Sequence, residues 1–142
     1  MKKIIIIGLL LVLTIGVVTA ADIDHMKMPD DFESTGGGQY RQVNTYNNGG
    51  TGFNVIIVEC TDTNFHDWTT NDTDLDYGVI KTGNLYWYTY MDTKGVFEIV
   101  NIDDEKYIVD FSATSLAEGG VDQAYDYMME FNDLNNLEPI AV

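Results

Sequence analysis

This sequence has little positive charge and almost no cysteine. Its 142 residues include 7 Lys+Arg against 23 Asp+Glu, which gives a formal net charge of −16 at pH 7. A strongly negative protein repels other polyanions, so nucleic acid is excluded as a partner. A single cysteine, Cys60, also excludes an intramolecular disulfide framework and a cysteine-based zinc finger.

Sequence motifs for phosphate, dinucleotide and acyl-transfer chemistry are missing as well. No glycine-rich loop is followed by Lys-Ser/Thr, and no nucleophile elbow or dinucleotide fingerprint is present. Hydrophobic residues make up 45% of the chain, which argues against a disordered protein. The length suits one domain and is short for two ordinary ones.

The N-terminal 21 residues have the pattern of a secretory signal peptide. A basic start is followed by an apolar run over residues 4–18 and then by small residues, with cleavage expected after Ala20 or Ala21. The alternative is an uncleaved anchor, in which residues 4–18 contact the membrane. Both readings predict that the rest of the chain is exported and works at the cell surface or outside the cell.

The remainder divides into an extended lead-in over residues 22–38 and a single α+β domain over residues 39–142. The domain is predicted to be an antiparallel sheet of about six strands, built from hairpins and a meander, with a C-terminal helix packed on one face. Short turn-rich separators require antiparallel neighbours, because a parallel crossover needs a dozen or more residues. Strands are expected at 39–45, 52–60, 77–81, 85–91, 96–102 and 106–112.

Local patterns support particular elements of this sheet. Asn-Asn-Gly-Gly at residues 47–50 predicts a hairpin turn. The uninterrupted apolar run at 55–58 predicts a central strand that is buried on both faces. A short helix is expected near residues 65–70, with Thr63 or Asn64 as its cap.

The C-terminal helix has the clearest pattern in the chain. Its apolar residues recur at intervals of three and four, while acidic residues fall on the opposite side. We therefore expect one apolar face to pack on the sheet and one acidic face to remain in solvent. The apolar positions are Val121, Ala124, Tyr127, Met128, Phe131 and Leu134, and the acidic ones are Asp122, Asp126, Glu130 and Asp133.

An acidic segment before the third predicted strand is a candidate Ca²⁺ site. Asp72, Asp74 and Asp76 alternate, as carboxylates do in a loop that wraps around Ca²⁺. The pattern is not an EF-hand, because Tyr77 stands where that loop requires glycine. The alternative is a solvated acidic loop, which is the commoner reason for such a run. No other cofactor is predicted.

The same segment contains a possible modification site. Asn71-Asp72-Thr73 matches the acceptor sequence for N-glycosylation, which would act on Asn71 in an exported chain. A glycan at this position would place the segment on the surface. It would also disfavour a tight metal site at Asp72.

An aromatic strand over residues 85–90 is a candidate ligand platform. Strand alternation places Tyr86, Tyr88 and Tyr90 on one face. If exposed, this row would bind sugar rings or a protein partner. The alternative is ordinary core packing, because aromatic residues are common in strands.

Catalytic residues cannot be assigned from the sequence. Cys60, His66 and Asp67 lie close enough along the chain to suggest a cysteine hydrolase. However, Cys60 ends an apolar strand among acidic residues, and a buried inert cysteine is the simpler interpretation. The preferred function is therefore binding of, or structural contact with, a protein, a glycan or a divalent cation. The alternative is a secreted hydrolase using carboxylates or Cys60.

The order of these features resembles that of small exported proteins of methanogenic archaea. The likeness rests on the lead-in Met-Pro-Asp-Asp-Phe at 28–32, the turn at 47–50, the strands at 96–100 and 107–111, and the segment 125–137. The layout is also loosely similar to the α/β/α sandwich of PsbP-like proteins. These resemblances imply an exported single domain, and they transfer no catalytic residue.

The acidic stripe of the C-terminal helix leads to a first prediction. Like charges at Asp122, Asp126 and Glu130 repeat at i+4, and each such pair costs about 0.2–0.5 kcal/mol. Salt screens this repulsion, so the melting temperature should rise with added salt or millimolar Ca²⁺. Thermal melts at low salt, at high salt and with Ca²⁺ test this, and three identical melting temperatures would contradict it.

Overall fold

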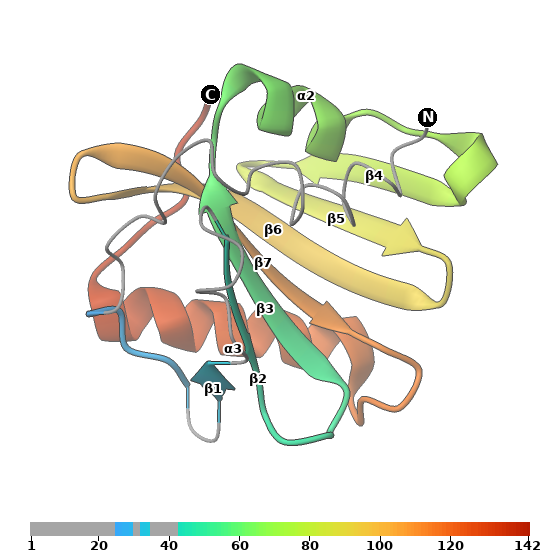
Figure 1. The fold of residues 1–142 in the computed structure, drawn as a ribbon, viewed down its shortest axis with the longest axis horizontal. Helices are drawn as coiled ribbons and strands as arrows, with labels where there is room; N and C mark the ends of the chain where they lie inside the picture. Colours follow the sequence, from blue (N-terminus) through green and yellow to red (C-terminus); the bar gives the residue numbers. More distant parts are fainter. Residues whose placement is uncertain (1–24, 30–31, 35–42) are drawn as a thin grey trace.

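A seven-stranded antiparallel sheet forms the centre of the computed structural model, which describes residues 25–29, 32–34 and 43–142 (Figure 1). The strand order is β1-β2-β3-β7-β6-β5-β4, so the last four strands along the chain form a meander. This confirms the predicted α+β class and its antiparallel pairing. The strands are β1 (Glu33–Ser34), β2 (Val43–Asn47), β3 (Phe53–Glu59), β4 (Tyr77–Thr82), β5 (Leu85–Tyr90), β6 (Thr93–Ile102) and β7 (Glu105–Ala113).

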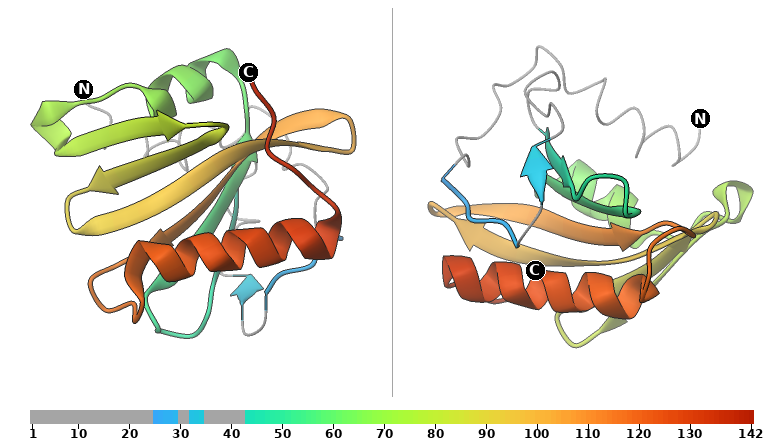
Figure 2. Two further views of the ribbon diagram at one scale, coloured as in Figure 1. Left: turned by 180° about the vertical axis from the view of Figure 1, so that it is seen from behind. Right: turned by 90° about the horizontal axis from the view of Figure 1, so that it is seen from below.

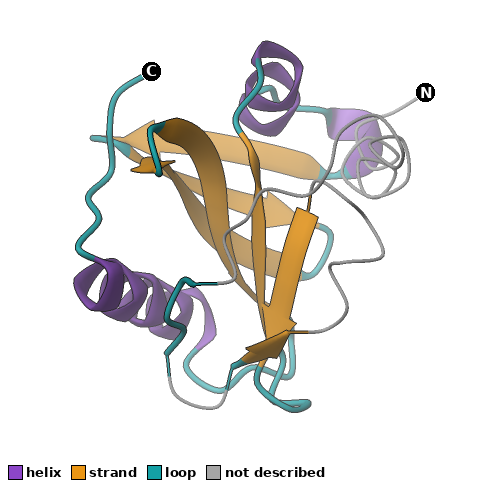
Figure 3. Ribbon diagram, turned by 60° about the vertical axis from the view of Figure 1, so that its left-hand side comes forward, coloured by secondary structure: helices purple, strands orange, loops and turns teal. Residues whose placement is uncertain are grey.

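Helices cover both faces of the sheet. The long helix α3 (Gly120–Asn135) lies along one face, and the short helix α2 (Asp62–Thr69) lies on the other, as Figures 2 and 3 show. A single 3-10 turn, η2 (Thr73–Leu75), joins α2 to β4. The C-terminal helix thus lies where the sequence pattern predicted it, on one face of the sheet.

Alternation along β6 and β7 separates two cores. On the α3 face, buried side chains of the sheet contact Ala124, Met128 and Phe131 of the helix. On the α2 face, Trp68 of the helix packs edge-on against Phe97 of β6, with ring centroids 5.3 Å apart. Because β6 and β7 are buried on both faces, their sequences are almost continuously apolar.

Three details differ from the sequence expectations. Helix α2 begins at Asp62 and is capped by Thr61, whose hydroxyl accepts a hydrogen bond from the Asn64 amide at 3.1 Å, not by Thr63 or Asn64. Leu134 is 41% exposed, and near the end of α3 the side chain buried against the sheet is that of Asn132. Strand β1 was not predicted, since its two residues are both exposed and carry no apolar alternation.

The described part of the lead-in is attached to the end of α3. The Lys27 amide donates to Asn135 Oδ1 at 2.8 Å, and Asn135 Nδ2 donates to the Lys27 carbonyl at 2.7 Å. Phe32 then enters the core beside Phe111 and Tyr127. The described residues of the lead-in, 25–29 and 32–34, therefore contact the folded domain.

The predicted signal peptide, residues 1–21, lies outside the described residues, as does the first part of the strand expected at 39–45. Within the described ranges, no helix has both the length and the apolar character needed to span a bilayer.

A buried carboxyl lies between the sheet and α3. Glu98 of β6 is fully buried, and its Oε1 accepts a hydrogen bond from Asn132 Nδ2 at 2.8 Å. Burial raises the pKa of Glu98 to about 8, and the Asn132 bond lowers it by a smaller amount. Glu98 is therefore mainly protonated at neutral pH.

This burial predicts an unusual pH dependence of stability. The folded protein holds a proton on Glu98 up to about pH 8, whereas the unfolded chain releases it near its ordinary value of 4.5. The free energy of unfolding should therefore be highest below that value and fall with rising pH through about 8, by about 1.4 kcal/mol per pH unit for one group. Denaturant titrations from pH 5 to 9 measure this slope.

Glu98→Gln should remove the contribution of Glu98 from that slope, because the amide keeps an acceptor for Asn132 and does not titrate. A second buried carboxyl, Asp110 of β7, has its pKa raised to about 8 as well and keeps its own contribution in this variant. Glu130→Gln, on the exposed side of α3, is the matched control and should leave the slope nearly unchanged. Equal slopes in the wild type and in Glu98→Gln would contradict the buried, protonated state.

Candidate ligand-binding site

The α2 face contains a cavity of about 240 Å³ beside the helix. Side chains alternate between the two faces along each strand, and this places Tyr88 and Tyr90 of β5 on the same face as Asp110 and Ser112 of β7, where they line the cavity. Helix α2 adds Trp68, and the start of β4 adds Tyr77. We call this cavity the tyrosine pocket; it is lined by Asn54, Ile56, Trp68, Tyr77, Tyr88, Tyr90, Thr93, Asp110, Ser112 and Thr114.

A buried carboxyl, Asp110, lines the tyrosine pocket. Its Oδ2 accepts a hydrogen bond from the Tyr88 hydroxyl at 3.0 Å, while Oδ1 is buried with no partner among the described residues. Burial raises the pKa of Asp110 to about 8, and the Tyr88 bond opposes this by a smaller amount. An unpaired oxygen on a buried carboxyl is costly, so its position in a cavity marks this place as a candidate binding site.

A second lining residue of the pocket, Trp68, also has an unpaired buried polar atom. The indole Nε1 of Trp68 is buried and donates to no acceptor within the described residues. The Tyr77 hydroxyl donates instead to the Trp68 backbone carbonyl. One pocket therefore contains an unused acceptor on Asp110 and an unused donor on Trp68.

The tyrosine rings of the pocket are fixed before any ligand arrives. Tyr77 lies 5.7 Å from Tyr88 and 6.3 Å from Tyr90 between ring centroids, with interplanar angles of 42° and 67°. Hydrogen bonds from the Tyr77 and Tyr88 hydroxyls hold two of these rings in place. Because the rings are inclined to one another, they form walls instead of a single stack.

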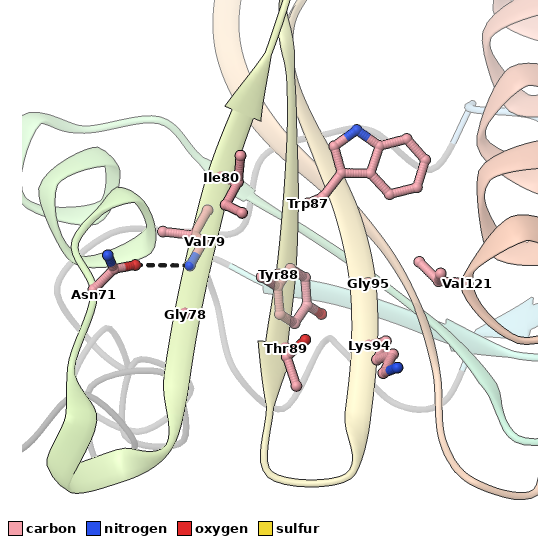
Figure 4. A pocket seen from close by; sticks show the side chains of 10 residues that line it. All are labelled: Asn71, Gly78, Val79, Ile80, Trp87, Tyr88, Thr89, Lys94, Gly95 and Val121. Atoms are coloured by element: carbon pink, nitrogen blue, oxygen red, sulfur yellow. Dashed lines mark hydrogen bonds between the residues drawn. The ribbon is translucent and has the colours of Figure 1, made fainter.

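Gly95 of β6 makes the position of Tyr88 possible. The two residues are direct cross-strand partners, and Figure 4 shows them side by side. A Cβ at position 95 would lie 2.5 Å from the Tyr88 ring and hydroxyl. The absence of a side chain therefore lets Tyr88 extend over the backbone toward Asp110.

The predicted row of tyrosines shares one face, but its members differ in exposure. Tyr86 is only 6% exposed and stacks on Phe97 at 4.8 Å between ring centroids. Tyr88 and Tyr90 are half-buried and line the pocket. The strand thus presents tyrosines inside a cavity, with Tyr86 in the core, in place of a flat platform of three rings.

The acidic segment forms turns around η2. Asp72 caps η2 through a hydrogen bond from the Asp74 amide to its Oδ1 at 3.0 Å, and Asp76 adopts a left-handed conformation at φ 55°. Asp74 and Asp76 line an open surface hollow of about 530 Å³ together with Asp92. Among the described residues, no group of three or more acidic, histidine or cysteine side chains is arranged to hold a metal ion. The Ca²⁺ site at Asp72, Asp74 and Asp76 stays a prediction.

The sequon asparagine, Asn71, is exposed. Its Oδ1 accepts a hydrogen bond from the Val79 amide at 2.7 Å, which Figure 4 shows as a dashed line. Asn71 also borders an open groove of about 460 Å³ along β4 and β5, with Ile80, Trp87 and Val121. This groove contains no unpaired buried polar atom within the described chain, which distinguishes it from the tyrosine pocket.

The residues of the hydrolase alternative do not line the tyrosine pocket: Cys60, His66 and Asp67 all lie outside it. His66 is largely exposed and lies 3.6 Å from Asp67, measured between Nδ1 and Oδ1. Burial raises the pKa of the half-buried Cys60 thiol, and Asp62 adds to this, while Lys106 opposes it. A raised pKa keeps the sulfur protonated, which works against a nucleophilic role.

Comparison with protein-family models, curated proteins and solved structures finds no match for this chain.

Sequence reasoning missed Asp110, although a signal was present. The segment Tyr-Ile-Val-Asp-Phe at 107–111 has one acid in an otherwise apolar strand. A charged residue at an inward position of a strand is rarely buried without a partner or a role. Glu98 in Val-Phe-Glu-Ile-Val at 96–100 carries the same signal on the other face.

Gly95→Ala tests how the pocket is built. The added methyl group collides with Tyr88 and should cost about 1–3 kcal/mol of unfolding free energy, as overpacking does in other cores. Gly78→Ala is the matched control, since a Cβ there meets nothing within 4 Å. Denaturant unfolding compares the two variants, and an equal loss in both would show that Tyr88 does not depend on Gly95.

Proposed function

We propose that this chain is an exported binding protein that holds a small ligand in the tyrosine pocket. The observation that carries the proposal is that two residues lining one cavity, Asp110 and Trp68, each have an unpaired buried polar atom, Oδ1 and Nε1. Small-molecule sites are typically apolar and aromatic hollows with a few fixed polar groups. The tyrosine pocket has that composition.

The size of the pocket limits the ligand. Its volume of about 240 Å³ lies below the range of about 300–1,000 Å³ that is typical of drug-sized sites. A ligand no larger than a single ring or a short branched chain fits. Export is part of the proposal and rests on the signal-like pattern of residues 1–21, while the acidic surface agrees with a protein that stays soluble outside the cell.

An NMR titration of the ¹⁵N-labelled protein with a library of small cationic, neutral and anionic compounds tests the proposal. At least one compound should shift the amide signals of residues 88, 90, 93 and 110–114, which belong to the strands that line the pocket. Signals that move only around Asp74 and Asp92, or only around Ile80, would place binding in another hollow and contradict the proposal.

Thr93→Phe provides a blocking variant, because Thr93 lines the pocket at the start of β6. The larger ring should fill the cavity and abolish the response. Thr89→Phe is the matched control: Thr89 is on β5 with its side chain on the opposite face, and it should leave binding intact. If both variants bind like the wild type, the tyrosine pocket is not the site.

A further inference from the structure

The polar groups of the tyrosine pocket are all acidic or neutral. Among the described residues, its lining includes no lysine or arginine, and Asp110 is the one carboxyl. The whole chain also carries far more acidic than basic residues, which raises the local concentration of cations around it. An anionic ligand would therefore find no positive partner among the described lining residues.

The two tyrosine hydroxyls nearest Asp110 are already engaged. Tyr88 donates to Asp110 itself, and Tyr77 donates to the Trp68 carbonyl. These hydroxyl protons are not free for a sugar ring, which needs several donors and acceptors from its site. The rings of Tyr77, Tyr88 and Tyr90 remain as inclined aromatic surfaces around the cavity.

Aromatic faces combined with a carboxylate are the chemistry that recognises an ammonium group with alkyl substituents. The ring quadrupoles attract the cation, and the rings also contact the methyl groups. Asp110 Oδ1 supplies the opposing charge, and Trp68 Nε1 supplies a donor for an acceptor atom elsewhere on the ligand.

We infer that the ligand of the tyrosine pocket is a small alkylated ammonium compound, with its cation held between the tyrosine rings and Asp110. This rests on the proposed function and adds the chemical class of the ligand. Burial raises the pKa of Asp110 to about 8 in the free protein, and a cation beside this carboxyl favours its ionised form, so ligand binding and ionisation of Asp110 occur together.

Choline and 3,3-dimethylbutan-1-ol are the probes that test the assignment. They have nearly the same shape and the same hydroxyl group, and differ in having nitrogen or carbon at the branched centre. Isothermal titration at constant ionic strength should give a dissociation constant for choline about tenfold or more below that of the alcohol. Equal affinities would overturn the ammonium assignment while leaving the pocket as a binding site.

Asp110→Asn should weaken choline binding by about tenfold or more and change alcohol binding little. Asp92→Asn removes the same charge from an exposed position outside the pocket and controls for long-range attraction. Equal losses in the two variants would overturn the role of Asp110. Tyr90→Leu is a second test that keeps the carboxyl, and it should also weaken choline more than the alcohol.

Proton release gives an independent readout. Asp110 faces the hydroxyl of Tyr88 and lies near that of Tyr77. Burial raises the pKa values of both tyrosines further above neutral pH, so Asp110, with a pKa of about 8, is the group that should ionise when the cation binds. Choline binding at pH 7 should release about one proton, measured by titration in buffers of different ionisation enthalpy. Choline binding without proton release would overturn the contact with an ionised Asp110.

The outcomes separate the two proposals. If the compound library yields a pocket ligand but choline does not bind, the ammonium assignment fails alone. If neither the library nor choline produces a response at the pocket, the proposed function fails and the assignment fails with it.

Discussion

The hydrogen bond from the Tyr88 hydroxyl to Asp110 is the interaction on which the candidate site depends. It spans two strands, β5 and β7, and passes over the backbone of β6 at Gly95. It satisfies one oxygen of a buried carboxyl that lines a cavity and leaves the other without a partner among the described residues. The pocket is therefore a consequence of how the sheet accommodates one acid in its interior.

The central pair of strands contains a second acid on the opposite face. Cross-strand pairing places Glu98 opposite Val109 and Phe97 opposite Asp110, so the two carboxyls lie at adjacent rungs of one ladder. Their surroundings differ, because Glu98 meets the amide of Asn132 under a continuous helix, whereas Asp110 meets a tyrosine beside a short one. Beside the shorter helix the sheet face is left with a cavity of about 240 Å³.

Most of the sheet could be predicted from the sequence because its strands have strong local signals. The apolar run at 55–58 does form a central strand, and the glycine-rich turn at 47–50 does join β2 to β3. Strand β1 and the attachment of Lys27 to Asn135 could not be predicted, since both depend on contacts between distant segments. The same holds for the pocket: alternation predicts which face a tyrosine occupies, but not where a helix of eight residues stops covering that face.

Gly95 and Tyr88 have a consequence for how this protein can diverge. The ring occupies the space that a side chain at position 95 would need, so a side chain at 95 requires a change at 88 as well. A relative with alanine or serine at 95 would need a smaller residue at 88, and its buried acid would lose a phenol donor. Such a chain would keep the seven-stranded architecture without the hydrogen bond that joins β5 to the buried acid of β7, so this contact can be lost in evolution while the scaffold is conserved.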